Sequence, residues 1–204
     1  HLIFVLDTSG SMGGAPWNEV VAAFYNFLGR RSANQGGAGD LASVVIFNHT
    51  AWAVMETQSL DVAANTGLQY SSGGTAFGPA MQEALRVSRL TRGTHTPMVL
   101  FLSDGCAGDT EAAKASIGTI DSESGGELQL HMVAFGAHAA AGQLQDMADK
   151  LPDGRGKLHR ATLQDVGMVF AQIAKNTAAS DRIFRAVGDK VARAVTDKVY
   201  LDYF

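Results

Sequence analysis

The chain has 204 residues, of which 46% are hydrophobic, and its formal net charge is −4. This length and composition allow one α/β domain with a sizeable core. The acidic balance argues against an electrostatic footprint for nucleic acid or an anionic membrane, and no apolar run approaches the roughly 20 residues that span a bilayer.

Cysteine content limits the possible structures and compartments. The single cysteine, Cys106, excludes an internal disulfide framework and a zinc site built from cysteines. It also favours a reducing, cytoplasmic compartment, although many extracellular domains lack disulfides as well. Because the chain begins with His1 rather than Met, we expect it to be processed, trimmed or cut from a longer protein, so the absence of a targeting signal says little about its compartment.

Short apolar runs alternate with amphipathic segments along most of the chain. The apolar runs predict six strands, at 2–6, 41–48, 51–56, 98–103, 128–136 and 157–161. Segments in which apolar residues recur every three or four positions predict helices at 17–30, 78–91, 111–120, 140–150 and 163–177. Asp109 stands just before the third of these helices and is expected to be its N-cap.

This alternation indicates βαβ crossovers. It predicts an α/β fold with a Rossmann-like, open, mostly parallel six-stranded sheet and helices on both faces. The connection "FNHTAW" between the second and third strands is short enough for a hairpin, so the third strand is expected to be an antiparallel edge strand. In sheets of this kind, ligands bind beyond the carboxyl ends of the strands.

Oxygen-bearing side chains occur in three segments that should reach this edge. "DTSGSM" (7–12) follows the first strand, "SSGGTAFGPA" (71–80) leads into a helix, and "FLSDGCAGD" (101–109) ends the fourth strand. They bring two carboxylates and three hydroxyls to one rim: Asp7, Ser9, Ser11, Thr75 and Asp104. Hard divalent cations such as Mg²⁺ prefer oxygen ligands in octahedral geometry, so this set predicts a metal site.

These motifs resemble the von Willebrand factor A (vWA) domain. The resemblance rests on D-x-S-x-S after the first strand, a threonine preceded by glycines and a Ser-Asp-Gly at a strand end, and it covers roughly residues 2–177. It implies that Asp7, Ser9, Ser11, Thr75 and Asp104 form the family's metal-ion-dependent adhesion site (MIDAS), holding Mg²⁺, Mn²⁺ or Ca²⁺.

The resemblance also implies a function. In the vWA family, one coordination position of the metal is left for a carboxylate from a partner protein. The chain would therefore be a metal-dependent protein-binding module and not an enzyme, with a protein ligand that supplies an Asp or Glu carboxylate. It would belong to a larger protein or assembly.

The last residues lie outside the usual limits of such a domain. We therefore expect a vWA domain over 1–177 and a C-terminal amphipathic helical extension over 178–204. Within the extension, apolar side chains fall on one side of residues 181–199, with basic residues around them. Packing against the parent domain and coupling to a neighbouring domain or partner are equally open roles for it.

Two other functions are kept as alternatives. One is a metal-dependent phosphoesterase, but the first strand does not end in the D-x-D of haloacid-dehalogenase-type phosphoryl transfer, because position 9 is Ser and the general acid is missing. No P-loop or G-x-S-x-G motif is present either. The other alternative is a structural vWA domain that binds through its C-terminal tail.

Three smaller features complete the predictions. The six histidines show no H-x-x-x-H or H-x-H spacing and are predicted to be surface or loop residues, with His131 inside a strand. Cys106 is predicted to be a small, semi-buried side chain. Residues 48–50, "NHT", form an N-glycosylation sequon that we attribute to chance.

Overall fold

The computed structural model describes residues 1–33, 39–136, 139 and 141–176. Six strands, five α-helices and two short 3₁₀ helices follow one another along these residues. They are β1 (Leu2–Asp7), η1 (Gly10–Met12), α1 (Ala15–Ser32), β2 (Leu41–Phe47), β3 (Ala51–Ser59), α2 (Leu60–Ala63), α3 (Phe77–Ser88), η3 (Arg89–Thr91), β4 (Met98–Ser103), α4 (Thr110–Glu123), β5 (Gln129–Phe135), α5 (Ala141–Ala148) and β6 (Gly156–Ala161). Residues 166–176 are also helical. The predicted extension over 178–204 lies outside the described residues.

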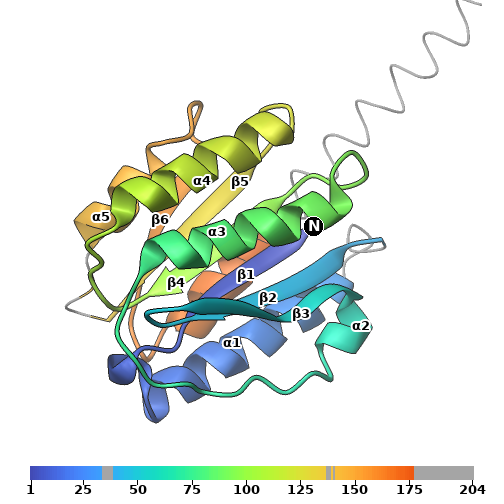
Figure 1. Ribbon diagram of the computed structural model, residues 1–204. Coiled ribbons are helices and arrows are strands. Elements are labelled where there is room, and N and C mark those ends of the chain that lie inside the picture. Colours follow the sequence, from blue (N-terminus) through green and yellow to red (C-terminus); the bar gives the residue numbers. More distant parts are fainter. Residues whose placement is uncertain (34–38, 137–138, 140, 177–204) are drawn as a thin grey trace, which may run out of the picture.

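The six strands form one sheet in the order β3-β2-β1-β4-β5-β6 (Figure 1). β1 pairs in parallel with both β2 and β4, β4 pairs in parallel with β5, and β5 with β6. The pairing of β3 with β2 is antiparallel. The predicted α/β fold is therefore confirmed, including its antiparallel edge strand.

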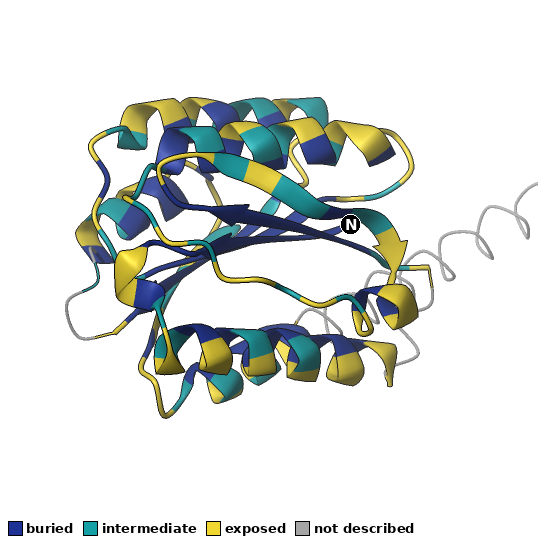
Figure 2. Ribbon diagram, turned by 60° about the horizontal axis from the view of Figure 1, so that its bottom comes forward, coloured by how far each residue is buried: buried dark blue, intermediate teal, exposed yellow. Residues whose placement is uncertain are grey.

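Helices cover both faces of the sheet, so its central strands are buried throughout (Figure 2). On one face, α1 and the helix at 166–176 pack on one apolar cluster, in which Phe4 makes edge-to-face contacts with Phe24 and Phe27 at ring distances of 4.9 and 5.2 Å. On the other face, α3, α4 and α5 pack on a second cluster. This two-sided burial explains why β1 and β4 read as continuous apolar runs.

The predicted elements differ from the observed ones mainly at their ends. The strand predicted at 51–56 continues to Ser59, where the serine side chain accepts a hydrogen bond from the Val62 amide and begins the four-residue helix α2. The helix predicted over 78–91 ends at Ser88 and continues as the 3₁₀ turn η3. None of the described helices combines the length and the apolar character that a membrane crossing requires.

Of the five histidines among the described residues, two are buried: His1 corrects the surface prediction, and His131 lies inside a strand as predicted. His1 is 6% exposed, and its ring nitrogens are hydrogen-bonded to the hydroxyls of Thr91 and Ser43, each at 2.8 Å. His131 is 5% exposed, and its Nδ1 lies 3.0 Å from Nε2 of His159 on the neighbouring strand β6. The spacing of the histidines along the sequence could not reveal these contacts, because each contact joins distant parts of the chain.

Candidate functional site

The sheet order itself marks one position for a site. The chain leaves β1 for β2 on one side and later returns to β4 on the other, so the carboxyl ends of β1 and β4 flank the point where the strand order reverses. Ligands of open α/β sheets bind at such points. Asp7 is the last residue of β1, and Asp104 directly follows β4.

Asp7 lies at the bottom of this site and is fully buried. One carboxylate oxygen, Oδ1, accepts a hydrogen bond from the Ser9 amide at 2.7 Å, and Oδ2 accepts one from the Ser103 hydroxyl at 2.5 Å. Burial raises the pKa of the Asp7 carboxyl above its usual value, although the hydrogen bonds from Ser103 and Ser9 act in the opposite direction. The fold therefore buries a carboxylate that no Lys or Arg contacts in the described residues.

Above Asp7, three side chains form a chain of contacts. The hydroxyls of Ser9 and Ser11 lie 3.3 Å apart, and the Ser11 hydroxyl donates a hydrogen bond to Oδ1 of Asp104 at 2.8 Å. Ser9 is buried, Asp104 is half-buried and Ser11 is exposed, so the chain leads from the core to the surface. Oxygens from the ends of β1 and β4 thus meet where solvent can reach them.

Thr75 reaches the same place from the segment before α3. A Cβ atom placed on Gly105 would lie 3.1 Å from Oγ1 of Thr75 and 3.4 Å from its Cγ2, so the threonine side chain packs directly against the backbone next to Asp104. The Gly105 amide in turn donates to the Ser103 hydroxyl, which bonds Asp7. All five residues that the sequence singled out therefore lie on one rim.

The donor set and its spacing fit a small, hard cation. Neighbouring ligands of an octahedral Mg²⁺, each roughly 2.1 Å from the ion, lie about 3 Å apart, which is close to the spacing from Ser9 to Ser11 and from Ser11 to Asp104. Within the described ranges, no three His, Cys, Asp or Glu side chains group together as a metal site. A cation at this rim would therefore depend on the hydroxyl oxygens in addition to the carboxylates.

Asn48 anchors the segment that carries Thr75, a role that the sequence did not reveal. The Asn48 side chain is buried, its Nδ2 donates to the Ser72 carbonyl at 3.1 Å, and its backbone carbonyl accepts from the Ala76 amide at 2.8 Å. A Cβ on Gly73 would come within 2.9 Å of Asn48 Cγ, so only glycine allows this close approach. In the folded chain, the sequon asparagine is thus a structural anchor.

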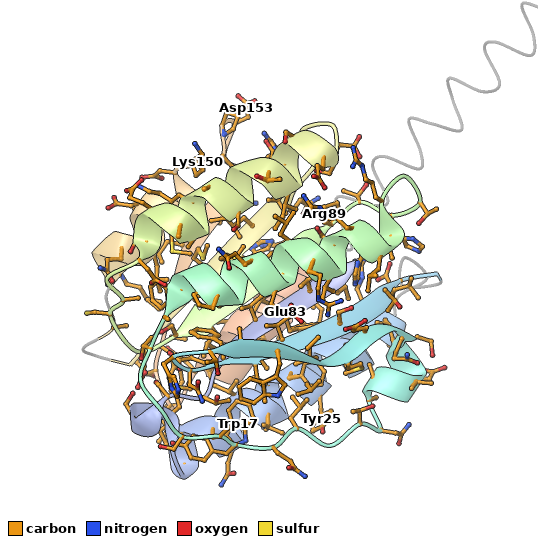
Figure 3. All side chains as sticks on the ribbon, in the orientation of Figure 1. Trp17, Tyr25, Glu83, Arg89, Lys150 and Asp153 are labelled. Atoms are coloured by element: carbon orange, nitrogen blue, oxygen red, sulfur yellow. The ribbon has the colours of Figure 1, made fainter. Side chains whose placement is uncertain are left out.

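Tyr70 connects the same segment to the loop after β1. Its hydroxyl lies within hydrogen-bonding distance of two carbonyls of that loop, those of Ser9 at 3.0 Å and Gly10 at 3.2 Å. The segment runs beside α1, whose residues Trp17 and Tyr25 are labelled in Figure 3. Trp17 contacts the Tyr70 ring at a centroid distance of 6.2 Å, and the Tyr25 hydroxyl donates to the Thr66 carbonyl.

Asp109 occupies the predicted N-cap position of α4, but its side chain acts elsewhere. It makes no side-chain hydrogen bond to its own helix. Its two carboxylate oxygens instead accept from the amides of Phe77 and Gly78, at 2.9 and 2.8 Å, which are the first two residues of α3. The sequence therefore predicted the position of Asp109 correctly, but the side chain caps α3 and not α4.

Cys106 lies on the same loop as Asp104 and is exposed, so the prediction of a semi-buried side chain was wrong. The loop after β4 bends outward between the buried Ser103 and the buried Ala107. A position at the outer turn of a loop has no core to pack against.

Comparisons with known proteins identify similar chains. Residues 2–107 match the family model of the von Willebrand factor type A domain. The chain is 28% identical over 144 residues to the uncharacterized protein sll0103 of a Synechocystis strain, a match that covers 68% of this chain and 32% of that protein. The chain therefore spans about a third of the length of this curated relative.

Solved structures share the fold. The vWF domain of the type V pili tip protein Mfa5 from Porphyromonas gingivalis superposes with a TM-score of 0.70 at 12% identity, covering 88% of this chain and 95% of that one. Proximal thread matrix protein 1 from the mussel byssus, whose structure has a zinc-occupied MIDAS motif, gives a TM-score of 0.67 at 16% identity, covering 87% of this chain and 45% of that one. At these identities, the likeness is one of fold.

Proposed function

This chain belongs to the von Willebrand factor type A family, and from this premise we propose that it is a metal-ion-dependent protein-binding module. In this proposal, Asp7, Ser9, Ser11, Thr75 and Asp104 hold one divalent cation, Mg²⁺ or in its place Mn²⁺ or Ca²⁺, as a MIDAS. A partner protein supplies an Asp or Glu carboxylate to the ion. The module forms part of a larger protein or assembly.

The observation that carries the proposal is the path of oxygens from buried Asp7 through Ser9 to Ser11 and Asp104 at the surface. The two carboxylates balance the charge of a divalent ion, and the small hydroxyls leave space above it. A bound cation would supply the positive charge that attracts the partner's carboxylate. Asp7 and Ser9 hold the inner side of the site, while the exposed Ser11 faces the partner.

The composition of the rim supports this dependence on an ion. The segments that surround the site, 7–14, 48–50, 71–76 and 103–109, contain neither Lys nor Arg. A partner's carboxylate would therefore find no cationic side chain in these loops and, without a metal, would face Asp7 and Asp104. Two of the similar solved structures come from a pilus tip protein and a byssal matrix protein, and these contexts favour a binding role for the present chain as well.

Isothermal titration calorimetry with MgCl₂ and MnCl₂ tests the metal site. We expect the wild-type chain to bind one ion and Asp7→Asn to bind at least about 100-fold more weakly, because the amide keeps the size of the side chain but removes its charge. Asp61→Asn, which changes an exposed carboxylate on α2, is the matched control and should bind as the wild type does. Equal binding by Asp7→Asn would contradict the proposal.

A pull-down from the native source tests the partner. Capture that EDTA abolishes and that an Asp7→Asn bait lacks would support a carboxylate ligand held through the metal. Capture that persists in EDTA but disappears on deletion of 178–204 would favour binding through the tail. Hydrolysis of a generic phosphate ester that EDTA abolishes would favour the phosphoesterase.

A further inference from the structure

We propose that Asp109 is a positioning residue that couples the Thr75 segment to the Asp104 loop, so that the two parts of the site move as one unit. This inference rests on the proposed metal-binding function. Asp109 itself lies outside the five proposed ligands. Its role would be to fix the position of one ligand relative to another.

The carboxylate of Asp109 takes the place of a missing cap on α3. The N-cap residue of α3 is Ala76, whose side chain cannot accept a hydrogen bond, and no acidic residue lies in the first turn of the helix. The amides of Phe77 and Gly78 would otherwise lack a partner, as the first amides of any helix do. Both donate to Asp109, at 2.9 and 2.8 Å, across sequence separations of 32 and 31 residues.

The close approach of α3 to Asp109 depends on a glycine. A Cβ on Gly78 would lie 2.8 Å from Oδ2 of Asp109 and 3.2 Å from Cβ of Ala112. Any side chain at position 78 would push the start of α3 away from the loop after β4. The absence of a side chain at position 78 thus allows this contact, as the absence of one at Gly105 allows the contact with Thr75.

Two contacts join the Thr75 segment and the start of α3 to the loop after β4. Gly105 packs against Thr75, and Asp109 binds the residues that directly follow the Thr75 segment. Thr75 stands two residues before Phe77, and Asp104 stands five residues before Asp109. With both contacts formed, the Thr75 and Asp104 side chains keep one position relative to each other. Without Asp109, the Thr75 segment is still held by the Gly105 contact, by the Asn48 anchor and by the hydrogen bond from the Gly10 amide to the Gly73 carbonyl at 2.9 Å.

A simple capping role would give the same hydrogen bonds, so the experiment must separate helix stability from positioning. Ala76 has the extended conformation of an N-cap residue, with φ −139° and ψ 122°, so Ala76→Ser can give α3 a cap of its own. We would therefore compare the wild type, Ala76→Ser, Asp109→Ala, Asp109→Asn and the double variant Ala76→Ser with Asp109→Ala. MnCl₂ affinity is measured by calorimetry, and thermal unfolding is measured in EDTA.

If Asp109 positions the ligands, Asp109→Ala weakens Mn²⁺ binding by about tenfold or more, as loss of a group that orients metal ligands does elsewhere. The double variant then recovers the melting temperature of the wild type in EDTA but keeps the weak Mn²⁺ binding. Asp109→Asn, which retains one acceptor oxygen for the two amides, binds Mn²⁺ with intermediate affinity. Ala76→Ser alone binds as the wild type does. Wild-type affinity in Asp109→Ala, or in the double variant, overturns the proposal.

Hydrogen exchange measured on the metal-free chain tests the role of Asp109 independently of the metal-binding function on which the inference rests. In EDTA, the amides of residues 71–76 should exchange faster in the double variant than in the wild type, because Phe77 and Gly78, which follow the segment, have lost their hydrogen bonds to the loop after β4. Equal exchange rates overturn the coupling. A wild-type chain that binds no Mn²⁺ would refute the metal function instead, while the exchange data would still decide whether Asp109 couples the two segments.

Discussion

The two ends of the sheet treat polar groups in opposite ways. At the carboxyl end, the ionisable side chain of Asp7 is fully buried beneath a rim whose loops contain no Lys or Arg. At the amino end, charged side chains have partners of opposite charge: the buried Arg31 pairs with Asp40, and Arg89 and Arg92 at the surface both pair with Glu123 beside a cavity of ≈ 270 Å³. Figure 3 labels Arg89, the first residue of η3, the turn that follows α3. The amino end also buries the His1 ring, but two hydroxyls bind it.

The two ends of the sheet therefore differ in how their charged side chains affect the stability of the fold. Burial of an uncompensated carboxylate lowers stability, because the charge loses its hydration without gaining an opposite charge. Ion pairs in solvent change stability little in either direction. The carboxyl end therefore contains a group whose position is unfavourable for folding alone, and a divalent cation would supply the missing opposite charge.

The strongest test of this contrast is the sign of the change in stability when Asp7 is neutralised. In EDTA at pH 7, Asp7→Asn should raise the free energy of unfolding by about 1 kcal/mol or more, because burial raises the pKa of this carboxyl and so disfavours its charged form. With excess Mg²⁺, the order should reverse, since only the wild type gains binding energy. Urea unfolding under both conditions measures this, and a destabilised variant in EDTA would break the comparison.

The buried His131 tests whether Asp7 is the only buried ionisable side chain that lowers the stability of the fold. Burial lowers the pKa of His131 to about 3, with smaller contributions from the charges of His159 and Lys157. The unfolded chain, in which this pKa is about 6.5, then binds more protons than the folded chain between these two values. Stability should fall as pH drops below about 6.5, by up to about 1.4 kcal/mol per pH unit.

His131→Leu should flatten this dependence. Urea unfolding in EDTA from pH 7.5 to pH 5 measures the slope, and His95→Gln, which changes a half-exposed histidine at the amino end, is the control. A slope in His131→Leu as steep as that of the wild type would show that other groups cause the acid sensitivity.

A smaller effect is expected at Tyr70. Tyr70→Phe keeps the ring that contacts Trp17 but removes the hydroxyl that binds the carbonyls of Ser9 and Gly10. The loss should lower stability by about 1 kcal/mol and weaken Mn²⁺ binding several-fold, because the loop after β1 loses one of its supports. Tyr25→Phe removes a similar bond from the same segment, to Thr66, and should leave Mn²⁺ binding unchanged.

The smallest effect should come from the amino end. Glu123→Gln removes the partner of Arg89 and Arg92 in an exposed setting. It should leave both the melting temperature and Mn²⁺ affinity close to those of the wild type, because solvent already screens these charges. A large loss in either measurement would show that the two ends of the sheet are not as different as their burial indicates.

The sequence could predict the features that depend on local pattern. Continuous apolar runs marked β1 and β4, alternation with helices gave the sheet type, and the strand ends placed Asp7 and Asp104 on one rim. Asn48 and Tyr70 escaped detection because they act on segments more than twenty residues away, and the stretch from 64 to 76 has no periodicity to analyse. The same long-range dependence explains Asp109, whose position was predicted from local sequence and whose partners were not.

The cap that Asp109 provides for α3 also constrains the order of folding. Most helix caps come from the residue next to the helix and are available as soon as the helix begins to form. The first turn of α3 must wait until the chain has continued through β4 and brought the loop at 103–109 back to it. Closing this loop costs chain entropy that a cap from the adjacent residue does not cost. The start of α3, and Thr75 with it, should therefore be among the last parts of this rim to become ordered during refolding.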